Sequence, residues 1–403
     1  MPFRSSAAVR VALLVLALFG FGAPSARAAE FTDAADRHVR LPASIMRVMA
    51  ANQAAAVLVF VLAPDKLVGW SRPLGYAERR LLPAKYARLP TIGRLAGSSP
   101  TATVATVARL RPDLVVYYGI LSPASVALAD RIERETGVPA IILDGRIGES
   151  FAALRLLGTV LGVAARGDAL GLYAEQAIDS IRGTLLIVPP AERPLVYYGL
   201  GFDGLETGLA GAVAMADIDE AGAINVAASL GSGELTRVTP ADIRFWNPDV
   251  IIAERRSFYD ALRRGRSWRN LAAVRNKRVF LEPAAPFGWI GDPPSVNRLI
   301  GLYWLSSLFY KGVAQTDLRT LVTEFYQTFY NVKPTDPQLD ALLRAAEPPP
   351  PPAPPPSVPA APPASSATGI PGLPGIGALP TLPGAPTPLE QTPNPGGAAP
   401  VKP

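Results

Sequence analysis

Cysteine is absent from this chain of 403 residues, and histidine occurs once, at His38. Without cysteine the chain can form no disulfide, thiolate nucleophile, Cys-ligated zinc site or iron–sulfur cluster, and no lipid can be attached through an N-terminal cysteine. One histidine cannot build a His-rich zinc site, and no G-x-S-x-G sequence supports a serine triad that would recruit it. We therefore expect no metal site, no cofactor and no enzymatic activity, and we interpret His38 as a surface side chain.

The chain also has little excess charge of one sign. Its net charge is +6, and Arg4, Arg10 and Arg27 supply three of these charges before position 29. A dedicated nucleic-acid-binding protein would concentrate far more Lys and Arg on one face, so we expect no nucleic-acid partner. Hydrophobic residues make up 49% of the chain, which is enough for sizeable cores in two domains.

Residues 1–28 have the pattern of a secretory leader. Arg4 and Arg10 precede an apolar run at 11–21, and Ala26-Arg27-Ala28 is a small-x-small cleavage pattern. The alternative, an uncleaved membrane anchor, is disfavoured because a spanning helix needs about 20 apolar residues. The leader predicts export to the periplasm, with cleavage near Ala28.

Residues 347–403 differ sharply from the rest, because Pro, Ala and Gly dominate them. Such a composition cannot bury enough apolar surface to fold, so we predict a disordered tail. Its P-x-x-P spacings leave two roles open, a ligand for a partner domain and a plain spacer, of which the spacer is favoured.

Between these ends, short apolar runs alternate with helical patterns, which is typical of an α/β domain with parallel strands. A hairpin turning at Asp36-Arg37 is expected first, and a basic helical stretch is expected at 257–271. The runs interpreted as strands are 66–70, 114–118, 140–143, 194–198, 250–253 and 278–281, and the last two helices are expected at 295–310 and 317–330.

Two segments repeat one pattern. Residues 108–118 read ARLRPDLVVYY and residues 244–253 read RFWNPDVIIA, so in each a helix ends at Pro-Asp and a buried strand follows. Between them, residues 165–186 predict one long helix with Asp168 as its N-terminal cap and Gly183 as a late break. Alone this would be read as a surface helix; between two like halves it becomes a connector. Its apolar stripe is Leu172, Tyr173, Ala177, Ile181 and Leu185.

Aromatic and basic side chains follow several of the predicted strands. Ligands of open α/β sheets bind outside the carboxyl ends of the strands. One member of each tyrosine pair is expected to face a cleft, and arginines there would suit an anionic ligand. The candidate ligand-binding residues are Trp70, Arg72, Tyr117, Tyr118, Tyr197, Tyr198, Arg255 and Trp289.

An ordered series of motifs resembles the periplasmic binding proteins of ABC importers for iron–siderophores, haem and vitamin B12. FTDAADRHVRLPASIMRVMA is similar to that family's opening hairpin. KLVGW, PTIGR, LRPDLVV, AGAINVAA, WNPDVII and WRNLAAVRNKRVFL follow in the family's order. The resemblance covers roughly residues 30–345.

The resemblance implies an α/β fold of two Rossmann-like lobes joined by a single long helix. We predict a leader at 1–28, an N-terminal lobe at 29–164, the interlobe helix at 165–186, a C-terminal lobe at 187–346 and the tail at 347–403. The implied function is capture of a solute by a monomer and its delivery to an ABC importer permease. A stiff helical connector implies only modest closure on the ligand.

The resemblance leaves the ligand and the permease contact open. The family's acidic docking positions hold about Ala105 and Ala241 here, with Asp242 adjacent to the second. An iron(III)–siderophore or related metal chelate is the first expected ligand. Molybdate, tungstate or cobalamin is the alternative. PFGWIGDPPSVNRLIGLYWL resembles a subgroup that includes oxyanion and metal-chelate binders, which adds molybdate or tungstate to the possible ligands. Haem is disfavoured, and a structural adaptor acting through its Pro-rich tail is the alternative from another class.

Overall fold

The computed structural model describes residues 29–97, 99–310, 312 and 317–343, which belong to one unit, Met1–Pro350. The predicted leader at 1–28 and the predicted tail at 347–403 lie outside these residues. No helix in the described part of the chain combines the length and apolar character needed to cross a membrane.

The chain opens with an antiparallel hairpin of β1 (Ala29–Thr32) and β2 (His38–Leu41), as predicted. Asp36 adopts a left-handed conformation in the turn, with φ of 58°. The buried Asp33 carboxylate accepts the backbone N–H groups of Ala35 and Arg37, and also that of Ile142 at 3.1 Å. The hairpin is thereby fixed to the first sheet.

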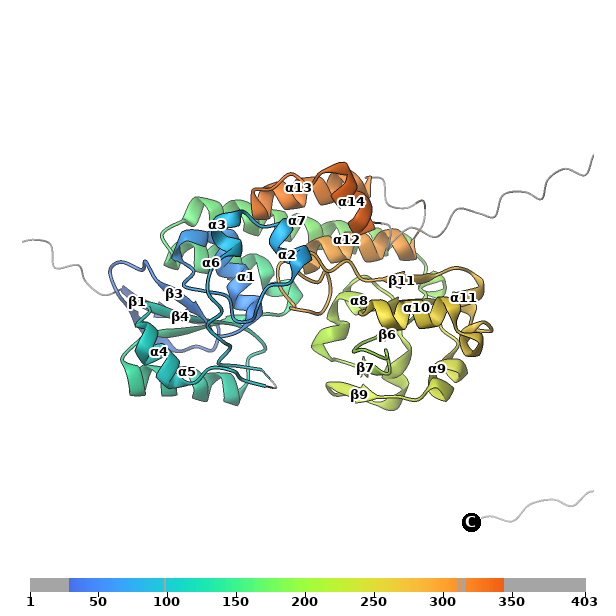
Figure 1. The fold of residues 1–403 in the computed structure, drawn as a ribbon, viewed down its shortest axis with the longest axis horizontal. Coiled ribbons are helices and arrows are strands. Elements are labelled where there is room, and N and C mark those ends of the chain that lie inside the picture. Colours follow the sequence, from blue (N-terminus) through green and yellow to red (C-terminus); the bar gives the residue numbers. More distant parts are fainter. Residues whose placement is uncertain (1–28, 98, 311, 313–316, 344–403) are drawn as a thin grey trace, which may run out of the picture. The chain divides into compact units, whose positions relative to one another are not determined.

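The first sheet is parallel, in the order β3 (Val48–Ala50), β4 (Leu114–Gly119) and β5 (Ala140–Asp144). Helices α1 (Gln53–Leu62) and α6 (Ser150–Val160) cover one face, and α4 (Val104–Leu110) and α5 (Pro123–Thr136) cover the other (Figure 1). Ser122 caps α5 at its start and Gly137 ends it in a left-handed conformation.

The strand predicted at 66–70 is wrong. Residues 64–66 form a 3-10 helix, and Leu67 and Trp70 make only isolated bridges, to Val48 and Thr91. Lys66 Nζ binds the carbonyl oxygens of Ile45 and Leu161 instead. The short helices α2 (Tyr76–Arg80) and α3 (Ala84–Ala87) follow.

The second sheet is also parallel, in the order β11 (Val279–Leu281), β10 (Val250–Ala253), β6 (Leu195–Gly199) and β8 (Ile224–Asn225). A separate antiparallel pair is formed by β7 (Glu206–Gly208) and β9 (Leu235–Arg237). The helices of this part are α8 (Ala216–Glu220), α9 (Pro240–Trp246), α10 (Arg256–Arg264) and α11 (Ala272–Arg275). Further 3-10 turns are Ile147–Glu149, Pro190–Glu192, Val213–Met215, Val226–Leu230 and Arg266–Trp268.

The predicted repeat is present in atomic detail. Helices α4 and α9 each end at a left-handed residue, Arg111 and Asn247, both with φ of 45°. The following Asp113 carboxylate accepts the N–H of Arg47 at 2.8 Å, and the Asp249 carboxylate accepts that of Leu195 at 2.9 Å. Each Pro-Asp pair therefore ends a helix and starts a strand beside its neighbour.

One helix of 24 residues, α7 (Ala164–Ile187), joins the two parts, so the predicted long helix is confirmed. Two details of that prediction are wrong. The helix starts after Val163, without an Asp168 side-chain cap, and it runs through Gly183 to Ile187. Leu172, predicted for the apolar stripe, is 48% exposed. Gly158 and Gly167 allow α6 and α7 to approach closely, since a Cβ on Gly158 would lie 2.7 Å from Gly167 Cα.

The chain ends its described part with α12 (Arg298–Phe309), α13 (Leu318–Tyr330) and α14 (Asp336–Leu343). The first two match the predicted helices at 295–310 and 317–330. Figure 1 shows α7, α12 and α13 alongside one another, and α12 packs against both of the others. Phe325 and Phe329 stack at 4.6 Å within this layer.

Candidate functional site

The carboxyl ends of the two parallel sheets supply the candidate site. In the first sheet β4 ends at Gly119 and β5 at Asp144; in the second, β6 ends at Gly199 and β10 at Ala253. Residues from both parts meet nearby, because the rings of Trp70 and Phe287 lie 5.6 Å apart. Ligands of open α/β sheets bind at such edges.

Five of the eight predicted site residues lie in the core. Their polar atoms are paired inside the protein: Trp70 Nε1 donates to the Tyr86 carbonyl, and Tyr197 Oη donates to the Gly204 carbonyl at 2.7 Å. Burial raises the pKa of Tyr198 well above its ordinary value, so its hydroxyl stays protonated. The five are Trp70 and Tyr118, each 1% exposed, and Tyr197, Tyr198 and Trp289, each fully buried.

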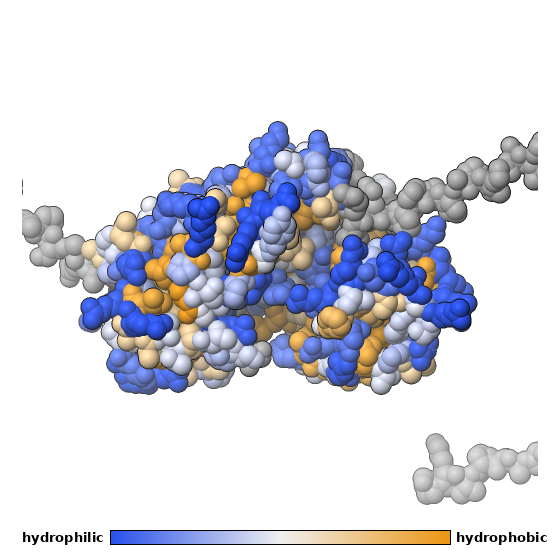
Figure 2. Space-filling model, in the orientation of Figure 1, coloured by the Kyte–Doolittle hydropathy of each residue, from blue (hydrophilic) through white to orange (hydrophobic). Residues whose placement is uncertain are grey.

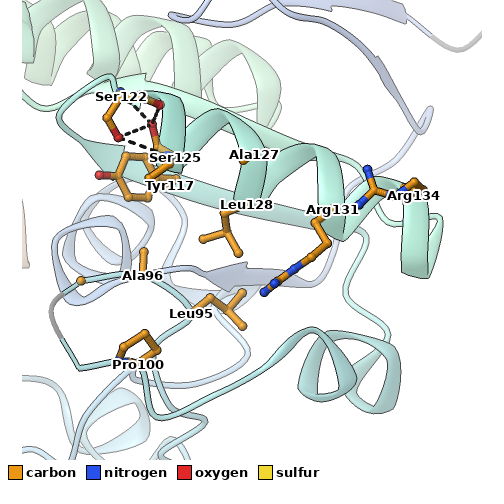
Figure 3. Close-up of a pocket in the computed structure, with 12 residues that line it drawn as sticks. Leu95, Ala96, Pro100, Tyr117, Ser122, Ser125, Ala127, Leu128, Arg131 and Arg134 are labelled. Carbon is orange, nitrogen blue, oxygen red and sulfur yellow. Dashed lines mark hydrogen bonds between the residues drawn. The ribbon is translucent and has the colours of Figure 1, made fainter.

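Tyr117 has a different setting from its neighbour Tyr118. It is partly buried on the α5 side of the sheet and lines a groove of about 660 Å³ between the loop after Leu95 and α5. Figure 3 shows Tyr117 beside Ser122 and Ser125 at one end of this groove, with Arg131 toward the other. The two tyrosines point to opposite faces of one sheet, as alternation along a strand requires.

The two predicted arginines are balanced by carboxylates. Arg72 Nη2 lies 2.6 Å from Glu78, and its side chain borders a hollow of about 380 Å³ with Thr91 and Arg94. Arg255 pairs with Glu254 at 2.9 Å and with Asp292 at 3.3 Å, and its side chain is 53% exposed. Both guanidinium groups are therefore largely neutralised by neighbouring carboxylates, and only Arg255 follows a strand of the sheet, β10.

Glu282, which follows β11, was not predicted from the sequence. Its buried carboxylate accepts hydrogen bonds from Tyr198 Oη at 2.6 Å, Ile290 N at 2.8 Å and Gly291 N at 3.4 Å. Burial raises the pKa of Glu282 to about 7. It fixes the loop after β11 against β6, and it lines a hollow of about 660 Å³ with Tyr76 and Arg80 of α2. An acid directly after a predicted strand was the available signal.

Arg298, the first residue of α12, was also missed. Its Nε lies 2.7 and 3.0 Å from the two carboxylate oxygens of Asp217 in α8, and its Nη1 donates to the Gly145 carbonyl, directly after β5, at 3.0 Å. Both side chains are 1% exposed, and Nη2 has no partner among the described residues. Arg298 thus connects the end of the first sheet to α8 and α12, and a single charge within a long apolar run was its signal.

Within the described part of the chain, no group of three or more His, Asp or Glu side chains is placed to hold a metal ion. His38 is exposed on β2 and its Nδ1 lies 3.3 Å from Thr32 Oγ1. The polar groups of the site are hydrogen-bond donors and paired carboxylates, which suit reversible binding of a solute.

Known proteins resemble this chain over most of its described length. It is 27% identical over 326 residues to the molybdate-binding protein MolA of Haemophilus influenzae, covering 74% of this chain and 90% of that protein. An ABC transporter solute-binding protein from Sulfurospirillum deleyianum shares the fold, with a TM-score of 0.72, 24% identity and coverage of 78% and 99% of the two chains. A periplasmic solute-binding protein from Veillonella parvula does so with a TM-score of 0.66, 22% identity and coverage of 79% and 98%.

A family model for periplasmic binding proteins matches residues 87–286. That stretch runs from the end of α3, through β4 and β5, the connecting helix α7 and the four strands of the second parallel sheet, to the loop that follows β11. The matched stretch therefore includes strands of both parallel sheets and the helix that joins the two parts. The chain belongs to the periplasmic binding protein family.

Proposed function

We propose that this protein captures a small oxyanion of the molybdate and tungstate class in the periplasm and delivers it to an ABC importer permease. The observation that carries the choice of ligand is Arg298, a buried guanidinium whose Nη2 has no hydrogen-bond partner among the described residues. Hydrogen bonds from charged donors to oxyanions are stronger than those between neutral groups. The likeness to a molybdate-binding protein over 90% of its length supports the same ligand class.

A bulky metal chelate has less support. Its binding would call for exposed aromatic walls, whereas Trp70, Tyr118, Tyr198 and Trp289 are at most 1% exposed. We propose that these four side chains stabilise the walls of the site, and that Arg72, Tyr117 and Arg255 are the predicted residues with surface available to a ligand.

Asp217 has a supporting role in this proposal. Its bidentate contact with Nε fixes the plane of the Arg298 guanidinium, and Gly145 O fixes the Nη1 side. The Nη2 group is therefore pre-oriented, so little side-chain entropy is lost on binding. Because Arg298 is as buried as the aromatic walls, those walls must part for a ligand oxygen to reach Nη2. Binding and release leave the ligand chemically unchanged, so the protein is not an enzyme.

The proposal also includes the boundaries of the lobes and the way in which the protein works. The exported chain loses residues 1–28, the lobes are 29–164 and 187–346, and residues 165–186 connect them. It works as a monomer that carries its ligand to the permease, with the docking positions at Ala105 and Ala241 changed from the acidic residues of the family pattern.

Isothermal titration calorimetry of the exported chain with molybdate and tungstate tests the ligand, with a ferric siderophore and cobalamin as comparators. We expect binding of the two oxyanions and not of the comparators. The R298Q variant should bind about 10- to 100-fold more weakly, the worth of one charge-assisted hydrogen bond. Arg278→Gln is the matched control, because Arg278 is a partly buried arginine that contacts the Leu308 carbonyl instead.

Circular dichroism of both variants separates lost binding from lost folding. Binding of the siderophore alone would restore the metal-chelate reading. Equal oxyanion binding by R298Q and the natural chain would remove Arg298 from the site.

A further inference from the structure

The stretch 255–278 carries more positive charge than the whole chain. It holds nine Lys and Arg residues and one acid, Asp260, which gives +8 against a net +6 for all 403 residues. The structure places it on α10, the 3-10 helix Arg266–Trp268 and α11 at the outside of the second sheet. Figure 2 shows hydrophilic residues gathered over α10 and α11.

Most of these cations have no carboxylate partner. We name the six exposed arginines other than the paired Arg255 the basic face. Arg256 and Arg263 flank the Tyr259 ring at 5.6 and 5.4 Å, and no member forms an ion pair within the described ranges. Lys277 adds a seventh exposed cation. The basic face consists of Arg256, Arg263, Arg264, Arg266, Arg269 and Arg275.

The apolar residues of the stretch are used elsewhere. Phe258, Tyr259 and Leu262 of α10 pack into the core of the second sheet, and Trp268 is 9% exposed. No large apolar side chain of 255–278 is exposed, so nothing here could insert into a bilayer or form the buried anchor of a protein interface. The absence of exposed rings among these described residues also removes the stacking platform of a single-stranded nucleic-acid site.

A surface of arginines without an apolar centre fits a flat, diffuse array of negative charge. We propose that the basic face binds the anionic phospholipid surface of the membrane, peripherally and through charge alone. Near such a surface each Lys or Arg contributes about 1 kcal/mol, a factor of about five in affinity. Retention at the membrane would raise the local concentration of the protein near a membrane-embedded partner. The proposal does not depend on which ligand the cleft takes.

Co-sedimentation with phosphatidylcholine vesicles, with and without phosphatidylglycerol, tests this surface on the full exported chain. We expect binding only to the anionic vesicles, lost at high ionic strength because exposed charges are screened. The triple variant Arg264→Gln, Arg266→Gln and Arg275→Gln should bind on the order of 100-fold more weakly, three steps of about fivefold. These side chains make no hydrogen bond or ring contact within the described residues, so folding should persist.

A control variant of equal charge change distinguishes a surface from net charge. Arg109→Gln, Arg131→Gln and Arg134→Gln removes three exposed arginines of α4 and α5 that form no ion pair within the described residues. It should change vesicle binding less than twofold. Equal losses in both triple variants, or equal binding to neutral vesicles, would overturn the proposal. So would binding of DNA or of an acidic protein that is lost in the first triple variant while anionic vesicles do not bind.

Discussion

Replacing Asp217 by asparagine tests whether the Arg298 pair is a buried connection between the two parts. The guanidinium is 1% exposed, and a guanidinium stays protonated in proteins, so it cannot escape the loss of its carboxylate. Breaking one partner of a buried ion pair costs about 3–5 kcal/mol. Asparagine keeps one oxygen acceptor for Nε, so we expect a loss near about 3 kcal/mol in the free energy of unfolding.

Arg298→Met should behave differently from Asp217→Asn. Burial raises the pKa of Asp217 and the Arg298 charge opposes that shift, so an Asp217 left without Arg298 can become neutral by binding a proton. A raised pKa means that the folded state holds the proton over a pH range where the unfolded chain has lost it. The R298M variant should therefore lose stability as pH rises above about 4, whereas the D217N variant, which has no carboxyl at this position to titrate, should show a flatter pH dependence of its free energy of unfolding.

Urea unfolding curves of D217L, R298M and D217L/R298M, compared with the natural chain, give a double-mutant cycle. The paired apolar replacement should unfold within about 2 kcal/mol of the natural chain, because well-packed apolar residues often replace a buried pair at little cost. The coupling free energy should then exceed about 2 kcal/mol. A D217N loss below about 1 kcal/mol, or additive single losses, would refute the view of this pair as a dry structural connection.

Three further outcomes follow from the same structure. The pKa of Glu282 is raised from 4.5 to about 7, so the free energy of unfolding should fall by up to about 3 kcal/mol as pH rises through this range. Glu282→Gln should flatten this pH dependence in urea titrations, and an unchanged pH dependence would show that other groups cause it. Trp70→Ala and Trp289→Ala should each cost about 3–5 kcal/mol, since both side chains are core, and a loss under about 1 kcal/mol would contradict their burial. Because α7 is uninterrupted from Ala164 to Ile187, X-ray scattering curves with and without molybdate should nearly superimpose, whereas marked compaction would indicate a hinge in the helix.

The fold could be predicted far better than the site. The patterns that predicted both parallel sheets and α7 are formed by residues close together in the sequence. They are the buried β-branched runs, the Pro-Asp pairs between helix and strand, and one long stretch with helical spacing. The failures are local too. Asp168 could serve as a cap, but α7 already starts at Ala164, and KLVGW has strand character with no neighbour to extend the sheet beyond isolated bridges.

The strand-end tyrosines show why a site resists this reasoning. A side chain near the carboxyl end of a strand still points to one face of the sheet or the other. Tyr198 and Tyr197 therefore pack into two different hydrophobic cores, on opposite faces of the second sheet. The polar groups at the carboxyl edge of a sheet belong to the residues just after each strand, such as Gly145, Glu254 and Glu282. Those positions have no periodicity by which to select them.

Long-range pairing is the other limit. Arg298 and Asp217 are 81 residues apart in the chain, and neither stands in a motif that names the other. The sequence does indicate that Arg298 needs a buried partner, although it does not identify that partner. A lone arginine in the apolar run SVNRLIGLYWL must either leave the helix face or find a buried partner, because an isolated charge in a core is too costly to persist. The partner, Asp217, becomes evident only in the folded chain, which brings α8 and the end of β5 to the first turn of α12. Arg298, the charged residue in an otherwise apolar segment of α12, is therefore the residue that connects the two parts of this binding protein.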